Sequence, residues 1–212
     1  MYYVGATIKS NMEDWSIIVR EQAAITLWTL AGIQKPQRRA IAEKIGSSQI
    51  LSMLMSKSEK LQYVGCKCMI ALVLENVKYQ NLILKENGTD PLIRLLRYEK
   101  TSSRVILSIL ETIAALCVDI AHVNNPRTQL DLTEKGTIDL VLNILNNPPT
   151  KYIQIETAYA LACLTLNRPN LEGIKDKINI ELILNLINEE NLVNMQIEKN
   201  KSKLIGLNPF IF

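Results

Sequence analysis

The sequence predicts an all-α fold, a solenoid of about four stacked helical repeats. Two independent sets of positions recur along the 212 residues with nearly constant spacing, and recurrence with a period of 20–50 residues is typical of repeat architectures. Aromatic residues make up only 5% of the chain, and both phenylalanines, Phe210 and Phe212, lie at its end. The core is therefore built from aliphatic side chains, which favours helix packed on helix.

The first recurring element is a charged stretch that ends in glycine. Its anchors are Gly46, Gly88 and Gly136, with Ile178 in a degenerate fourth copy, and the spacings are 42, 48 and 42 residues. Apolar residues stand four, five and eight positions after each anchor, a pattern that predicts one stripe on an amphipathic helix. Start signals for these helices are Ser47 or Ser48, Asp90 with Pro91, and Thr137.

The second recurring element is a longer, more apolar helix that follows each short one. Its last core positions align as Leu30, Val73, Leu116 and Leu164, spaced by 43, 43 and 48 residues. The distance from each glycine to this position is 27 or 28 residues, so both elements keep one register. The extra residues of the longest period fall between Leu116 and Gly136, where turn-forming residues predict a longer connection.

These anchors divide the chain into predicted segments. The repeat domain spans residues 15–198, between an N-terminal tail at 1–14 and a C-terminal tail at 199–212. Within the domain we expect a partial repeat, three repeats and a second partial repeat, at residues 15–45, 46–87, 88–135, 136–177 and 178–198. One such unit cannot bury its apolar face alone, so stacking makes the core continuous.

Composition excludes several function classes. A net charge of +3 is too small to indicate nucleic acid or an anionic membrane as partner. We expect no disulfide framework among the four cysteines and no signal peptide in the starting segment MYYVGATIKSN. No apolar run reaches the about 20 residues that a membrane-spanning helix needs. We expect an intracellular, cytoplasmic protein, with the nucleus left open, that binds no nucleic acid, spans no membrane and needs no cofactor.

Four local patterns have both a chemical and a structural interpretation. Cys66 and Cys68 could begin a metal site, but no second ligand pair stands at zinc spacing and core packing explains them better. Cys117 and His122 could form a nucleophile and its base; the alternative is that His122 is a loop or helix-end histidine without a catalytic role. Asn87 begins a glycosylation acceptor, although Gly88 already has a structural role as anchor. The basic cluster Lys35–Arg39 is either a partner contact or a solvated face. None of these patterns predicts an enzyme.

Two parts of the chain resemble armadillo repeats, in which glycine opens the second helix and the third helix is rich in alanine. The first part is GTDPLIRLLR followed by SSRVILSILETIAALCV, and the second is GTIDLVLNIL followed by IQIETAYALACLTL. The resemblance covers roughly residues 15–198 and implies a right-handed α-solenoid, an armadillo-like superhelix. It also implies a concave groove lined by the third helices, where the family binds extended peptides or partner domains.

The resemblance suggests candidate groove residues. In the family's nuclear-import adaptors this groove carries a ladder of tryptophan and asparagine. The equivalent columns here are Ile25, Cys68, Glu111 and Tyr159, and Thr29, Leu72, Ala115 and Cys163. The ladder is absent. The candidates for partner binding are polar or amphipathic residues on or beside these columns, for which inter-repeat packing is the alternative: Trp28, Arg104, Glu111, Gln154 and Tyr159.

The leading hypothesis from the sequence is a non-enzymatic module that presents this groove to an extended peptide or partner domain. One alternative is a structural spacer within a larger multi-repeat scaffold protein. The other is an import-type adaptor, which the missing asparagine column disfavours. Neither end of the solenoid carries a convincing polar cap. We therefore expect a fragment or isoform of a longer protein, which self-associates through its end faces when it is expressed alone.

Overall fold

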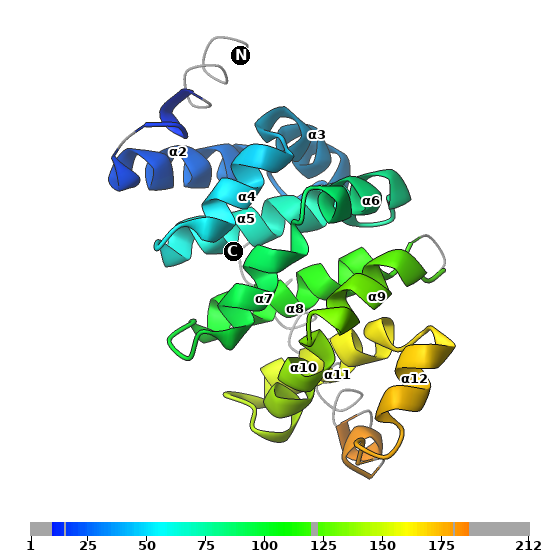
Figure 1. Ribbon diagram of the computed structural model, residues 1–212. Coiled ribbons are helices and arrows are strands. Elements are labelled where there is room, and N and C mark those ends of the chain that lie inside the picture. Colours follow the sequence, from blue (N-terminus) through cyan, green and yellow to red (C-terminus); the bar gives the residue numbers. More distant parts are fainter. Residues whose placement is uncertain (1–9, 15, 120–122, 180, 187–212) are drawn as a thin grey trace, which may run out of the picture. The chain divides into compact units, whose positions relative to one another are not determined.

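The computed structural model describes residues 10–14, 16–119, 123–179 and 181–186, and these are helical apart from short connections (Figure 1). From α2 to α11, two short helices of 9–11 residues stand between each long helix of 14 or 15 residues and the next, and the short α12 follows. The helices are α2 Ile17–Leu30, α3 Lys35–Ile45, α4 Ser47–Met55, α5 Glu59–Val73, α6 Val77–Lys85, α7 Thr89–Arg97, α8 Ser103–Cys117, α9 Pro126–Glu134, α10 Thr137–Asn146, α11 Lys151–Leu164 and α12 Arg168–Ile174.

The chain divides into two compact units, Met1–Gly173 and Ile174–Phe212. In the first unit the helices form consecutive triplets, α3–α5, α6–α8 and α9–α11, and α2 occupies the place of a third helix before them. The third helices pack in succession, α2 on α5, α5 on α8 and α8 on α11. In the second unit residues 181–186 are helical and Leu186 is buried. The domain limits expected from the sequence stay a prediction, and the tail at 199–212 lies outside the described residues.

Aliphatic residues of the third helices fill the core of the first unit. Large side chains without solvent contact include Met69, Leu72, Ile109, Ile113 and Leu116. Burial of each such side chain stabilises the fold by roughly 1.5–3 kcal/mol. No helix in the described ranges combines the length and apolarity that a membrane crossing requires.

Glycine opens each second helix for one of two reasons. Gly46 and Gly136 are the N-cap residues of α4 and α10 and have φ of 87° and 79°, a conformation that costs other residues steric strain. Gly88 caps α7 with φ of −70°, and Asn87 before it takes the positive φ of 53°. A Cβ on Gly88 would lie 2.5 Å from Ile83 Cγ2. The predicted start signals therefore stand after the cap, Ser47 and Thr137 by one position and Ser48 and Asp90 by two, and none of these three helix starts has a side-chain cap bond.

The third helices share a capping residue that fixes their register. Ser16, Ser58, Ser102 and Thr150 are the N-caps of α2, α5, α8 and α11, spaced by 42, 44 and 48 residues, and the last three accept a hydrogen bond from a backbone N–H of the first turn. The residue fourteen positions after each cap is a leucine: Leu30, Leu72, Leu116 and Leu164. The predicted alignment on Val73 is therefore wrong by one residue in α5.

Side chains of the first helices bind the carboxyl ends of the third helices. Gln80 on α6 donates to the backbone oxygens of Val73 at 3.2 Å, Ala115 at 2.9 Å and Val118 at 2.7 Å. Its own Oε1 accepts from Asn125, the cap of α9, at 2.8 Å. One glutamine thus joins α5 and α6 to α8 and α9.

The same contact recurs in the neighbouring repeats. Gln129 on α9 donates to Cys117 O at 3.3 Å and Cys163 O at 2.8 Å, and it accepts from Asn167 at 2.9 Å. On α3 the donor is Arg39, which binds the backbone oxygens of Ala71 and Leu74 at 3.3 and 2.5 Å. We call these three donors, Arg39, Gln80 and Gln129, the repeat clamps.

Replacing a clamp should destabilise the stack. Gln80→Ala leaves backbone oxygens at the ends of α5 and α8, and the Asn125 amide, without their partner in a buried site. Val73 O keeps the backbone N–H of Asn76, so three buried groups lose their partner. At about 1–3 kcal/mol each, we expect a loss of about 3 kcal/mol or more in the free energy of unfolding, measured by urea denaturation. Gln22→Ala, at an exposed glutamine of α2, should change it by less than about 0.5 kcal/mol; equal effects would contradict the clamp.

Gly88→Ala should also lower stability, because the new methyl group meets Ile83 and, at 3.1 Å, Leu51. Overpacking of this kind costs about 1–3 kcal/mol. Gly173→Ala is the matched control, since nothing lies within 4 Å of its Cβ position and alanine favours a helix by up to about 1 kcal/mol. Thermal melting should show opposite shifts of Tm for the two variants.

Candidate functional site

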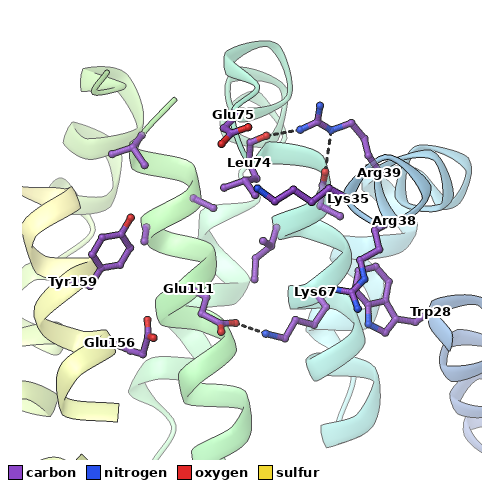
Figure 2. A pocket seen from close by; sticks show the side chains of 15 residues that line it. Trp28, Lys35, Arg38, Arg39, Lys67, Leu74, Glu75, Glu111, Glu156 and Tyr159 are labelled. Atoms are coloured by element: carbon purple, nitrogen blue, oxygen red, sulfur yellow. Dashed lines mark hydrogen bonds and ion pairs between the residues drawn. The ribbon is translucent and has the colours of Figure 1, made fainter. Parts of the chain in front are cut away.

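A groove of about 360 Å³ runs across the inner faces of the third helices in the first unit (Figure 2). Its lining comes from α2, α5, α8 and α11, together with the start of α3. The lining residues are Trp28, Lys35, Arg38, Arg39, Lys67, Ile70, Ala71, Leu74, Glu75, Glu111, Ala114, Ala115, Val118, Glu156 and Tyr159.

The floor of the groove is apolar, and three of its residues are alanines. Ile70 and Ala71 of α5 lie beside Ala114 and Ala115 of α8, and Leu74 and Val118 stand at the carboxyl ends of the same helices. Small side chains leave space above the floor that an inserted side chain can fill. The polar groups of the groove stand along its walls.

An ion pair occupies the centre of the groove. Lys67 of α5 binds Glu111 of α8, and both side chains are largely covered, with exposed fractions of 22% and 29%. Lys67 also lies over the Tyr63 ring, 5.6 Å from its centre, and Arg104 stacks on the same ring at 3.8 Å. These contacts hold the central charges in place by cation–π attraction as well as by charge.

The end of the groove at α2 and α3 is cationic. Arg38 lies 5.1 Å from the centre of the Trp28 ring and donates from Nε to the backbone oxygen of Gly32 at 2.7 Å. Lys35 is exposed at the first position of α3. Figure 2 shows the Lys35 side chain reaching over the groove while Arg39 is bound to the end of α5. Lys35 and Arg38 therefore present positive charge beside an aromatic ring.

The opposite end, at α11, carries tyrosines and a carboxylate. Tyr159 is 47% exposed and lines the groove with Glu156. Partial burial raises the pKa of Tyr159, with a smaller contribution from nearby Cys163. Burial likewise raises the pKa of Tyr152, and the charge of Glu156, which hydrogen-bonds to it, adds to the shift. Both phenols therefore stay protonated at neutral pH and can donate hydrogen bonds.

Three of the five predicted site residues, Trp28, Glu111 and Tyr159, line the groove. Arg104 lies outside the lining, stacked on Tyr63. The prediction that Gln154 flanks the groove is wrong, because its side chain is only 8% exposed and donates to the backbone oxygen of Leu145 at 2.9 Å. Gln154 fastens α11 to α10 instead.

Lys67 was not predicted from the sequence. Cys68 and Leu72 stood in the two predicted groove columns, but they are 0% and 1% exposed and belong to the core. Aligning the N-caps instead gives Ile25, Lys67, Glu111 and Tyr159 in one column and Thr29, Ala71, Ala115 and Cys163 in the other. The serine and threonine caps were the signal that could have found Lys67.

The cysteines that the sequence suggested as metal ligands or nucleophiles belong to the core. Cys66, Cys68, Cys117 and Cys163 are free thiols and all are buried. His122, considered as a base for Cys117, lies outside the described residues. In the part of the chain that the structure describes, no three His, Cys, Asp or Glu side chains gather as a metal site.

The chain is similar to a segment of known repeat proteins. It is 38% identical over 136 residues to the ankyrin and armadillo repeat-containing protein of Mus musculus, a match that covers 64% of this chain and 9% of the relative. It is 37% identical over 86 residues to the Homo sapiens protein of the same name, which covers 41% of this chain and 6% of the relative. The chain thus spans less than a tenth of the length of these relatives. No family model matches it.

Solved structures show the same fold at low identity. An engineered protein matches 86% of this chain and 71% of its own with a TM-score of 0.70 and 17% identity. A designed armadillo repeat protein matches 80% of this chain and 68% of its own with a TM-score of 0.66 and 16% identity. The fold is an armadillo repeat solenoid. The all-α class and the armadillo resemblance expected from the sequence are confirmed.

A third neighbour of this armadillo solenoid is a designed armadillo repeat protein solved in complex with the peptide (KR)4. It matches 84% of this chain and 77% of its own with a TM-score of 0.64 and 19% identity.

The four thiols of this armadillo domain should be unreactive in the folded chain. Burial raises the pKa of Cys66 to about 12 and raises those of the other three cysteines, so little thiolate forms at pH 8. A chromogenic disulfide reagent should label fewer than one thiol rapidly in buffer and four in denaturant. Because the folded pKa values are raised, the stability that they contribute is complete below pH 9 and is lost as the pH rises above it. Rapid native labelling would show an open core.

Proposed function

We propose that this chain is a non-enzymatic protein-interaction module, whose groove binds an extended peptide or an extended segment of a partner domain. The observation that carries the proposal is the continuous groove over α2, α5, α8 and α11, with an apolar floor and with aromatic and charged walls. Apolar surface with a few placed polar groups is what a ligand site needs. The neighbour solved with (KR)4 shows that an armadillo scaffold can hold a peptide.

The groove walls supply side chains suited to anchoring such a segment. Trp28 and Tyr159 stand at opposite ends of the lining, and aromatic and arginine side chains are the types that most often dominate binding energy. Arg38 over Trp28 is held by its bond to Gly32. A held side chain loses less entropy when a ligand arrives.

The structural spacer is the second candidate. It is favoured by the Lys67–Glu111 pair, because charges that satisfy each other do not require a ligand. An import-type adaptor is disfavoured, since Ala71 and Ala115 stand where that class has asparagines, and Lys35 and Arg38 repel a basic signal. The cytoplasmic location is part of our proposal and is supported by the four free cysteines. Self-association through the end faces stays a prediction.

Selection of random extended peptides on the whole chain tests the proposal. Selected peptides should lose about tenfold in affinity or more with Tyr159→Ala, because truncating an anchoring aromatic residue costs about 1–2 kcal/mol. Glu111→Ala should also change the affinity, since it breaks the central pair. Affinities are measured by fluorescence anisotropy, and melting curves verify the fold of each variant.

Tyr98→Ala is the matched control, because Tyr98 is 58% exposed and lies outside the groove. Its removal should leave affinity unchanged. If peptides bind equally well to the Tyr159 and Glu111 variants, or if no peptide is selected, the spacer explains the chain better.

A further inference from the structure

The charges around the groove are unevenly distributed. Four cationic side chains, Lys35, Arg38, Arg39 and Lys67, line its half nearest α2 and α3, where Glu75 at the end of α5 is the carboxylate of the lining; Glu111 belongs to α8 and Glu156 to α11 (Figure 2). Lys67 is neutralised by Glu111, and the guanidinium of Arg39 is used by the end of α5. Lys35 and Arg38 are left to act on a ligand.

Lys35 is suited to contact a ligand. It is exposed, lines the groove and makes no hydrogen bond or ion pair with the residues that the structure describes. Arg38 is fixed over Trp28 through Nε, which leaves the outer nitrogens of its guanidinium to bind an oxygen pair. A carboxylate placed here would meet two cations beside an apolar ring.

At the other end the lining is acidic and aromatic. Glu156 and Tyr159 face the groove from α11 (Figure 2). Glu156 accepts from Tyr152, and a carboxylate has acceptor sites for several donors. A lysine or arginine placed here would meet a carboxylate flanked by tyrosine rings, which also attract cations.

The floor offers a peptide backbone few partners. The column nearest the floor reads Thr29, Ala71, Ala115 and Cys163, and neither alanine can hydrogen-bond to a backbone amide. Covering peptide groups without giving them a partner costs free energy. Affinity must therefore come from the ligand's side chains, by apolar insertion over Ala71 and Ala115 and by charge at the two ends.

We propose that the groove takes an extended segment of mixed charge. Its aspartate or glutamate lies at Lys35 and Arg38, an apolar side chain lies on the alanine floor, and its lysine or arginine lies at Glu156 and Tyr159. This inference rests on the peptide-binding function proposed above and names the class of partner. An all-basic segment such as (KR)4 is a poor ligand, because it brings more positive charge to the cationic half.

The span of the groove sets the length of the probe. Four packed helices place three steps of about 10 Å between α2 and α11, and an extended chain advances about 3.3 Å per residue. A segment of about nine residues therefore reaches from one end to the other.

The test uses four labelled peptides of eight or nine residues and the full chain, with fluorescence anisotropy as the readout. Two of the peptides have mixed charge. Both carry two glutamates at one end, a central leucine and two lysines at the other end, and they differ in whether the glutamates or the lysines come first. The others are (KR)4 and an all-acidic peptide. One mixed order should bind at least about tenfold more tightly than (KR)4 or the all-acidic peptide, and added salt should weaken it.

A charge reversal locates the acidic end of the ligand. Lys35→Glu should weaken the better mixed peptide about threefold or more, and replacing the peptide's glutamates by lysines should restore the lost affinity. The variant should fold, because a carboxylate is favourable at a helix start. Lys78→Glu is the matched control, at an exposed lysine in the first turn of α6 outside the groove.

The outcomes separate this inference from the proposed function. If (KR)4 or the all-acidic peptide binds as tightly as both mixed peptides, and Tyr159→Ala abolishes that binding, the charge assignment is overturned while the groove function stands. Equal effects of Lys35→Glu and Lys78→Glu also overturn the assignment. If no peptide binds, or if Tyr159→Ala changes nothing, both the inference and the proposed function fail.

Discussion

The stack depends on how the carboxyl ends of its third helices are satisfied. An α-helix leaves its last carbonyl oxygens without partners inside the helix, and here the ends of α5, α8 and α11 lie between repeats. Arg39, Gln80 and Gln129 bind these oxygens from the first helix of the same triplet, and Gln80 and Gln129 also bind the end of the third helix of the triplet before their own. Without such donors, burial of the oxygens would oppose stacking. The clamps therefore fix the third helices next to one another, and the inner faces of those helices are the groove.

The helices could be predicted from the sequence because their signals are local. Apolar residues recur every three to four positions, and Gly46, Gly88 and Gly136 mark where the second helices begin. The clamps could not be predicted, because each makes at least one bond to a residue 32 to 45 positions away. Arg39 illustrates this limit: in the sequence it belongs to a basic cluster at a helix start, and only the packing of α3 against α5 distinguishes it from Lys35.

The lining of the groove was predicted in part. Trp28, Glu111 and Tyr159 were found because a groove-facing residue interrupts an apolar helix with a polar or amphipathic side chain. Lys67 was missed because Val73 and Leu72 are both apolar, and periodicity alone cannot select between adjacent core positions. Gln154 was misplaced for a related reason, since a polar side chain in a helix can serve an internal bond as well as a surface. The caps resolve the register, because a serine or threonine must stand at one defined position.

The pairing of Lys67 with Glu111 has a consequence for how a partner would approach. Opposite charges in contact cancel each other's field within a short distance, so the middle of the groove attracts charged molecules of neither sign. The outward field then comes from the Lys35 side and from the α11 side, with opposite signs. Such a field exerts a torque on a dipolar chain and aligns it before contact. Because the pair leaves charge only at the two ends of the groove, a partner of mixed charge would be oriented along the groove before the two surfaces touch.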